Sequence, residues 1–127
     1  MIKQNLIIFY VTDQKAAMLF YKSILDSDPS LDVPGMTEFK IGSDSRLGLM
    51  PLAGAKKLLG EACFPRGSKA FPKAELYLSV DSAEGYLDRA IMGGATLIQK
   101  VENRDWGDRA GYCLDPDGHV LAFAEAL

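Results

Sequence analysis

The sequence has a single histidine, His119, and this restricts the acid–base and nucleophilic chemistry that the chain could perform. An imidazole exchanges protons near neutral pH, so His119 could serve as a general acid or base. A Ser–His or Cys–His triad would have to be built around this one residue, and the sequence contains no G-x-S-x-G nucleophile motif. Because His119 directly follows the tight-turn sequence Asp115-Pro-Asp-Gly118, we favour a structural role in closing a hairpin.

The single tryptophan, Trp106, is a candidate for direct contact with a ligand. It lies in a turn sequence, Asn103-Arg-Asp-Trp-Gly107, whose polar residues and glycine favour exposure over a place in the core. An exposed indole stacks well on planar compounds. Four more aromatic residues on predicted strands could line a site, although ordinary sheet core is an equally good interpretation for each: Tyr10, Phe39, Tyr77 and Tyr112.

Composition and charge argue against several classes of protein. The 127 residues suffice for one domain with a core, and 48% hydrophobic and 24% charged residues are typical of a globular protein. A net charge of −3 without a basic stripe argues against nucleic-acid binding. The N-terminal apolar run is too short to span a bilayer and lacks a signal-peptide pattern, so we expect a cytoplasmic protein. Its two cysteines, Cys63 and Cys113, are then expected to stay reduced.

One pattern of apolar residues occurs twice in the chain. Residues 5–26 and residues 74–93 each read as an apolar strand, an acidic turn and an amphipathic helix. Short strand segments follow each copy and end within residues 43–51 and 115–125. A duplicated unit of this kind limits the fold strongly.

The duplication predicts a single α+β domain over residues 1–127. It consists of two tandem βαβββ repeats, of about residues 1–51 and 74–127. We expect a ligand to sit in a cleft built from both copies.

Helix-capping residues mark where the two predicted helices begin. Thr12 or Asp13 would cap the first helix, because a short side-chain oxygen accepts a free N–H of the first turn. Asp81, with Glu84 three residues later, would cap the second in an arrangement like a capping box. The second helix is expected to stop at Gly93-Gly94.

Residues 52–73 join the two repeats, and the sequence predicts an irregular loop there because glycine and proline recur along it. This loop holds five basic residues and one acidic residue, so it could steer an anionic ligand or close over a site as a flap. A solvated connection is the interpretation we favour.

Three features together resemble the glyoxalase/bleomycin-resistance/dioxygenase family, the vicinal oxygen chelate superfamily. They are the duplicated unit, Phe20-Tyr21 in the first helix and the terminal sequence WGDRAGYCLDPDGHVLAF. The resemblance covers nearly the whole chain except residues 52–73. It implies two βαβββ modules whose mixed sheets form an open cup, and members of this family are often dimers. It also implies a divalent metal, bound through His and Glu, that polarises paired oxygens of a substrate.

The family places up to four metal ligands on the inward faces of the cup, two on first strands and two on last strands. Matched onto this sequence, the four positions hold Leu6, Gly48, Glu75 and Ala122. Only Glu75 could bind a metal, and a single carboxylate does not hold a catalytic divalent ion. The resemblance therefore implies a member of the family without the metal, and we expect no cofactor.

The sequence thus favours a metal-free small-molecule-binding protein of the bleomycin-resistance type. We expect it to sequester an aromatic or hydrophobic, antibiotic-like compound as a homodimer, with neither nucleic acid nor membrane as partner. The candidate ligand contacts are Tyr10, Phe39, Glu75, Tyr77, Trp106 and Tyr112.

Two alternatives stay open at this point. Glu75 could act as a lone general base in an apolar cup, which would make the protein a glyoxalase-like lyase or a related enzyme of the same superfamily. Other candidates for that chemistry are His119, Glu38 and Glu125. A regulatory or structural dimer without a ligand is the second alternative.

Overall fold

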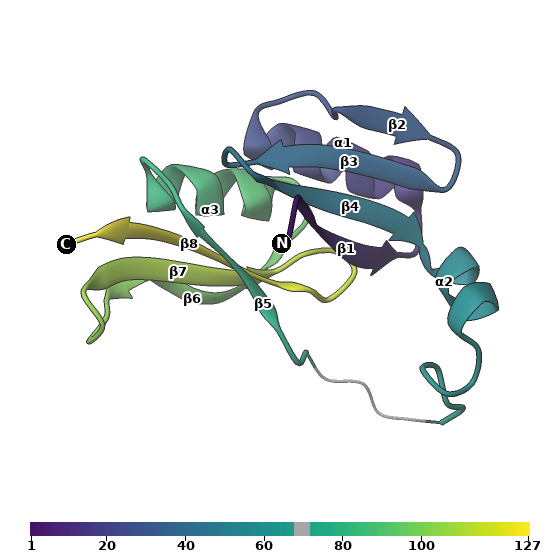
Figure 1. Ribbon diagram of the computed structural model, residues 1–127. Helices are drawn as coiled ribbons and strands as arrows, with labels where there is room; N and C mark the ends of the chain where they lie inside the picture. Colours follow the sequence, from purple (N-terminus) through teal and green to yellow (C-terminus); the bar gives the residue numbers. More distant parts are fainter. Residues whose placement is uncertain (68–71) are drawn as a thin grey trace. The chain divides into compact units, whose positions relative to one another are not determined.

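A computed structural model describes residues 1–67 and 72–127 (Figure 1). By its internal contacts the chain divides into two compact units: Met1–Lys22 with Asp26–Ala70, and Ser23–Leu25 with Phe71–Leu127. No helix within the described ranges is long and apolar enough to cross a membrane. Each unit contains one sheet with its own core.

The first unit is built on a four-stranded mixed sheet (Figure 1). Its elements are β1 (Asn5–Val11), α1 (Gln14–Leu25) except for its last three residues, β2 (Leu31–Val33), β3 (Met36–Ile41), β4 (Ser45–Pro51) and α2 (Leu52–Leu59). The strand order is β1-β4-β3-β2, with β1 and β4 parallel and the other neighbours antiparallel. The last strand of the repeat therefore lies in the interior of the sheet, beside the first strand.

The core of this unit lies on the face of the sheet that packs against α1. The ring of Phe9 lies 6.3 Å from that of Tyr21 on the helix. Phe39, Leu47 and Leu49 share this face by register and alternation, and all three are fully buried. The opposite face of the sheet is left for other contacts.

The second unit repeats this arrangement. Its elements are β5 (Glu75–Ser79), α3 (Ala83–Met92), β6 (Thr96–Asn103), β7 (Asp108–Leu114) and β8 (Val120–Ala126). The strand order is β5-β8-β7-β6, and the parallel pair is again the first and last strands, β5 and β8. The α+β class and the duplicated βαβββ order are therefore confirmed.

Close packing between α3 and its sheet leaves no room for a side chain at Gly111. This residue lies on β7 opposite Phe123, whose ring packs 5.6 Å from that of Tyr86 on the helix. A Cβ atom at Gly111 would come within 2.8 Å of both the Leu87 and the Val101 side chains. Glycine at this position lets α3 approach the sheet closely.

The structure differs from the sequence prediction in two segments. Helix α2 occupies Leu52–Leu59, inside the segment predicted to be irregular, and it ends at Gly60, whose φ of 68° suits glycine. Strand β2 was also not predicted, because it is only three residues long. It pairs with β3 and is one of the three strands that follow α1 in the first repeat. Residues 68–71 of the predicted loop, including Lys69, lie outside the described residues.

One of the two predicted helix caps is confirmed and the other is wrong. Asp13 caps α1 by accepting the Ala16 backbone N–H at 2.9 Å. The cap of α3 is Ser82 instead of Asp81, and its Oγ accepts the Gly85 N–H at 3.1 Å. Ser82 has the extended backbone of an N-cap, which shifts the start of the helix by one residue.

Glu84 does not complete a capping box, because it forms an ion pair with the neighbouring sheet. Its carboxylate accepts from Arg109 of β7 at 2.6 Å, and this lowers the pKa of Glu84 and raises that of Arg109. Glu125 of β8 accepts the Ala83 N–H at 2.6 Å, so that carboxylate serves the helix N-terminus. The predicted end of α3 at Gly93-Gly94 is confirmed.

The close approach at Gly111 gives a prediction about stability. Gly111→Ala should lower the free energy of unfolding by about 1–3 kcal/mol, because the added methyl overpacks the contact with Leu87 and Val101. Gly54→Ala is the control, since a Cβ there would meet only Met50 Cε at an ordinary 3.5 Å and the residue lies within α2. Urea unfolding measures both variants, and equal stabilities would contradict the packing described here.

The corrected cap of α3 gives a second prediction. Ser82→Ala should lower the free energy of unfolding by about 0.5–2 kcal/mol, because the Gly85 N–H loses its acceptor. Asp81→Ala, one residue earlier, should change it by less than about 0.5 kcal/mol. Thermal and urea unfolding of the pair decide which residue is the cap, and a larger loss for Asp81→Ala would contradict the assignment.

Candidate ligand-binding site

The face of the second sheet that points away from α3 gathers most of the predicted ligand contacts. Tyr77 on β5, Ala122 on β8 and Tyr112 on β7 lie in one row across three neighbouring strands. Glu75 and Asp108 share this face, because each lies an even number of residues from a tyrosine on the same strand. The sheet therefore places two tyrosines and two carboxylates on one surface.

Two hydrogen bonds fix the tryptophan and one tyrosine of this surface. The Trp106 indole N–H donates to the Tyr77 hydroxyl at 3.0 Å, and the Tyr77 hydroxyl donates to Asp108 Oδ2 at 2.5 Å. Donation to the carboxylate raises the pKa of Tyr77. Trp106 nevertheless stays 56% exposed and Tyr77 36% exposed. Both rings are thus held in place while keeping an accessible surface.

Tyr112 is held from the other side by an arginine. The Arg104 guanidinium carbon lies 5.4 Å from the centroid of the Tyr112 ring, and its Nε and Nη2 donate to the Ala110 carbonyl. Partial burial raises the pKa of Tyr112, and the negative charge of Glu75 raises it further. Glu75 and Tyr112 are therefore close enough to interact electrostatically.

We call these five residues, Glu75, Tyr77, Trp106, Asp108 and Tyr112, the aromatic face. Four of the side chains come from two strands of one sheet, β5 and β7, whose register with β8 sets their positions, and Trp106 comes from the turn before β7. Four of the five were predicted as ligand contacts from the sequence. The structure brings those four together within one unit.

Tyr10 and Phe39 belong to the first unit and lie on opposite faces of its sheet. Tyr10 points away from α1, and its ring packs against Phe64 at 5.8 Å, so part of the connection after α2 folds onto this face. Phe39 is fully buried on the face toward α1. Phe39 therefore offers no surface to a ligand, and the structure removes it from the candidate set.

The register of the two sheets shows which residues occupy equivalent positions. Gly48 on β4 lies between Ile8 and Glu38, and Ala122 on β8 lies in the same way between Tyr77 and Tyr112. Leu6 and Glu75 come two residues before the equivalent positions on the first strands. The four positions matched to the family's metal ligands thus point away from the helices.

The residues at these positions do not fit a divalent metal. Gly48 has no ligating atom, and even a Cβ there would come within 3.0 Å of Met36 Sδ and 3.2 Å of Ile8. The neighbouring carboxylate, Glu38, is nearly buried and forms a salt bridge with Arg46 at 3.0 Å. No group of three or more metal-ligating side chains occurs among the described residues. Catalytic metal sites in proteins use about three such ligands.

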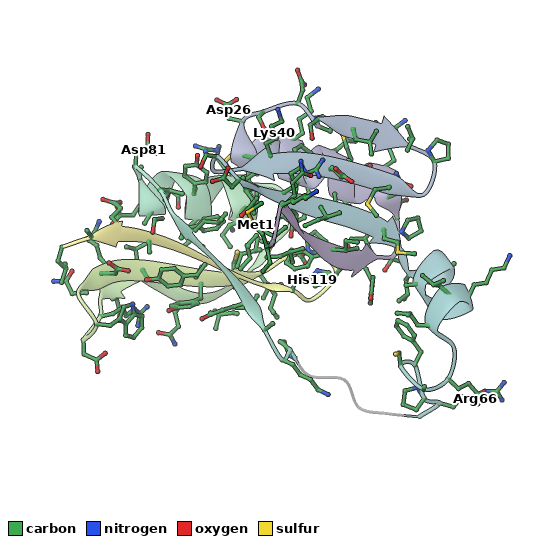
Figure 2. All side chains as sticks on the ribbon, viewed as in Figure 1. Met1, Asp26, Lys40, Arg66, Asp81 and His119 are labelled. Atoms are coloured by element: carbon green, nitrogen blue, oxygen red, sulfur yellow. The ribbon has the colours of Figure 1, made fainter. Side chains whose placement is uncertain are left out.

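His119 has a structural role in the turn that precedes β8 (Figure 2). Its backbone N–H and its ring Nδ1 both contact the Asp115 carboxylate, at 2.8 Å and 2.8–3.0 Å. Asp115 also accepts the Asp117 N–H, and its backbone N–H donates to the His119 carbonyl. These bonds close the hairpin, which agrees with the interpretation that we favoured from the sequence.

Both cysteines are free, and one of them is buried in the core of the second unit. Burial raises the pKa of the Cys113 thiol to about 11. A thiol with this pKa stays protonated at neutral pH and is a poor nucleophile. Cys63 is exposed in the connection after α2.

A separate groove of about 630 Å³ lies on the helix side of the second unit, between α3 and β6. It is lined mainly by Leu87, Ile91, Met92, Leu97 and Val101, with charged residues at the rim. Glu84, Asp88 and Lys100 supply its charged groups, and no aromatic side chain lines it for stacking on a planar compound. The aromatic face is therefore the better candidate site.

Asp108 and Arg104 were not predicted from the sequence, although both organise the aromatic face. Asp108 fixes Tyr77, and Arg104 packs on Tyr112. Strand alternation back from Tyr112 places Asp108 on the same face, so that signal was present in the sequence. The sequence contained no such signal for Arg104, because its contact with Tyr112 depends on how the turn folds back on β7.

Comparisons with known proteins agree with this fold. A structure from Burkholderia phytofirmans, described as a glyoxalase/bleomycin resistance protein/dioxygenase family enzyme, is similar with a TM-score of 0.81 and 24% identity, covering 96% of this chain and 97% of that one. The structure of a glyoxalase-related enzyme from Fulvimarina pelagi is similar with a TM-score of 0.79 and 19% identity, and the match covers 95% of this chain and 86% of that one. An uncharacterized protein from Mycobacterium bovis is 28% identical over 120 residues, which are 92% of this chain and 79% of the relative.

The family model for the Glyoxalase/Bleomycin resistance protein/Dioxygenase superfamily matches residues 3–123, which is nearly the whole chain. The duplicated βαβββ order of the structure agrees with this match. The chain belongs to the Glyoxalase/Bleomycin resistance protein/Dioxygenase superfamily.

Proposed function

We propose that this protein binds and sequesters a small planar aromatic compound, without a metal and without changing the compound chemically. The observation that carries the proposal is the exposed pair of Trp106 and Tyr77, held in fixed orientation by hydrogen bonds to each other and to Asp108. The proposal includes a homodimer of the bleomycin-resistance type. The dimer would act by binding an antibiotic-like ligand stoichiometrically.

The fixed orientation of the rings supports binding as their role. An exposed tryptophan without partners would sample several rotamers, and a ligand would have to order it at a cost of about 0.5–1.5 kcal/mol. Here the indole N–H already donates a hydrogen bond to the Tyr77 hydroxyl. The indole is therefore ordered when the protein folds, before a ligand binds. Stacking then contributes about 0.5–1.5 kcal/mol per aromatic pair in addition to the burial of apolar area.

The residues around the face support binding more than catalysis. The positions matched to the family's metal ligands lack a ligand set, and His119 is bonded to Asp115 in the hairpin turn. Glu125 accepts the Ala83 N–H at the start of α3, and Glu38 is paired with Arg46, so two of the alternative acid–base candidates have structural partners. Of the acid–base candidates for the alternative enzyme, Glu75 is the one that lies on the aromatic face.

Fluorescence of the single tryptophan tests the proposal directly. Three tricyclic probes of similar shape and different charge are titrated: 9-aminoacridine as a cation, acridone as a neutral compound and acridine-9-carboxylate as an anion. At least one should quench Trp106 with one site per chain. Tyr77→Phe should weaken that binding about 3- to 10-fold, because one net hydrogen bond is worth about 0.5–1.5 kcal/mol.

Tyr86→Phe is the matched control, because Tyr86 lies on α3 and packs on the other face of the same sheet. It should bind the probes like the unsubstituted protein. Native mass spectrometry of the purified protein reports the oligomer and any bound metal in the same experiment. Absence of quenching by all three probes would contradict the proposal. Recovery of a chemically altered ligand, lost in Glu75→Gln, would favour the alternative lyase.

A further inference from the structure

A polar pocket of about 320 Å³ lies at one end of the sheet of the first unit. It forms where the chain enters β1 and where the turn between β3 and β4 closes, because Asn5 of β1 and Lys40 of β3 (Figure 2) both lie beside the first residues of β4. Every residue that lines it is polar or charged: Lys3, Gln4, Lys40, Ser43, Asp44, Ser45 and Arg46. This pocket therefore differs from the groove between α3 and β6, whose lining is mainly apolar.

Positive charge exceeds negative charge in this pocket, although the whole chain carries a net charge of −3. Its cations are Lys3, Lys40 and Arg46, and the one carboxylate among its lining residues is Asp44. The salt bridges of the described residues include Arg46 with Glu38 but neither of the two lysines. Two ammonium groups without a protein counter-ion thus line the pocket.

Arg46 is held in a fixed orientation between two side chains. Its Nη1 donates to Glu38 Oε1 at 3.0 Å, and its Nη2 donates to Gln4 Oε1 at 2.6 Å. These bonds use two of the five N–H donors of the guanidinium. The Arg46 side chain is still 35% exposed, so donors remain for a ligand in the pocket. A planar guanidinium matches the geometry of phosphate oxygens.

The donors and charges of the pocket suit a phosphate group. A phosphate monoester carries a charge of about −1.5 to −2 at neutral pH and has three strong acceptor oxygens. These oxygens can accept from the two ammonium groups and from the guanidinium at the same time. Because no apolar side chain lines the pocket, it offers no surface to an acyl chain, which favours a soluble ligand over a lipid.

Asp44 limits the affinity that this pocket can reach for an anion. Its Oδ2 accepts the Ser43 hydroxyl at 3.3 Å, and its carbonyl accepts the Asn5 side-chain N–H at 3.3 Å. The carboxylate repels an anion, and the lysines attract it. Substitutions at Asp44 and at Lys40 should therefore change the affinity for an anion in opposite directions.

We propose that this pocket binds the phosphate group of a small soluble compound, with Lys3, Lys40 and Arg46 as its contacts. The proposal goes beyond the proposed function, because it places a second site in the other unit and assigns it a ligand of different chemistry. It depends on none of the residues of the aromatic face.

The ligand class is tested by titrating the isotope-labelled protein with inorganic phosphate and with glycerol 3-phosphate, at low salt and about pH 8, where both are dianions. The backbone amide signals of residues 43–46 should shift and saturate in an NMR titration. Acetate, a monoanion, should bind at least about fivefold more weakly than either phosphate compound. Sodium chloride at about 0.5 M should weaken the binding of both phosphate compounds.

Three substitutions locate the site in the same NMR titration. Lys40→Gln should weaken binding of glycerol 3-phosphate about 2- to 5-fold, and Asp44→Asn should tighten it by a similar factor. Lys57→Gln is the matched control, because Lys57 is an exposed lysine on α2, which follows the opposite end of β4. It removes one positive charge from the same unit without touching the pocket, so binding should stay within about 1.5-fold of the unsubstituted protein.

Several outcomes would overturn this inference. They are an absence of saturable shifts at residues 43–46, equal affinity for acetate and the phosphate compounds, and equal weakening by Lys57→Gln and Lys40→Gln. Binding to vesicles that contain phosphatidic acid, without binding of glycerol 3-phosphate, would overturn the assignment of a soluble ligand. Quenching of Trp106 by the acridine probes is a separate measurement, so the proposed function and this inference can fail independently.

Discussion

The arrangement of both sheets depends on one pairing, in which the last strand of each repeat inserts beside the first strand. In the second unit β8 lies between β5 and β7, and its small residue Ala122 has Tyr77 on one side and Tyr112 on the other. Because alternate residues of a strand point to opposite faces, this register decides which side chains meet α3 and which form the aromatic face. A slip of one residue would bury the tyrosines and expose Phe123.

The two repeats use the same framework for different surfaces. On the first sheet Leu6, Ile8 and Gly48 give an apolar face whose carboxylate, Glu38, is neutralised by Arg46. On the second sheet Glu75, Tyr77 and Asp108 give a polar aromatic face. The framework is that of the superfamily, and the chemistry on it differs between the repeats, which is why we place the site on the second one.

Much of the fold could be predicted from the sequence, because it depends on local patterns. The duplication, the Asp13 cap, the hairpin turn at Asp115 and the stop at Gly93 all follow from residue types at short spacing. The facing of Phe39 was missed, although Glu38 and Lys40 flank it on β3 and alternation places it on the face opposite to both charges. The roles of Arg104 and Ser82 depend on tertiary contacts and on a shift of one residue, which sequence patterns do not resolve.

The central claim is that the aromatic face of the second sheet is the binding site. A crystal structure of the protein with 9-aminoacridine tests it most directly, because it shows both the position and the orientation of the ring. We expect the tricyclic ring to stack against Trp106 and Tyr77. A ring bound in the groove between α3 and β6, or on the first sheet alone, would contradict it.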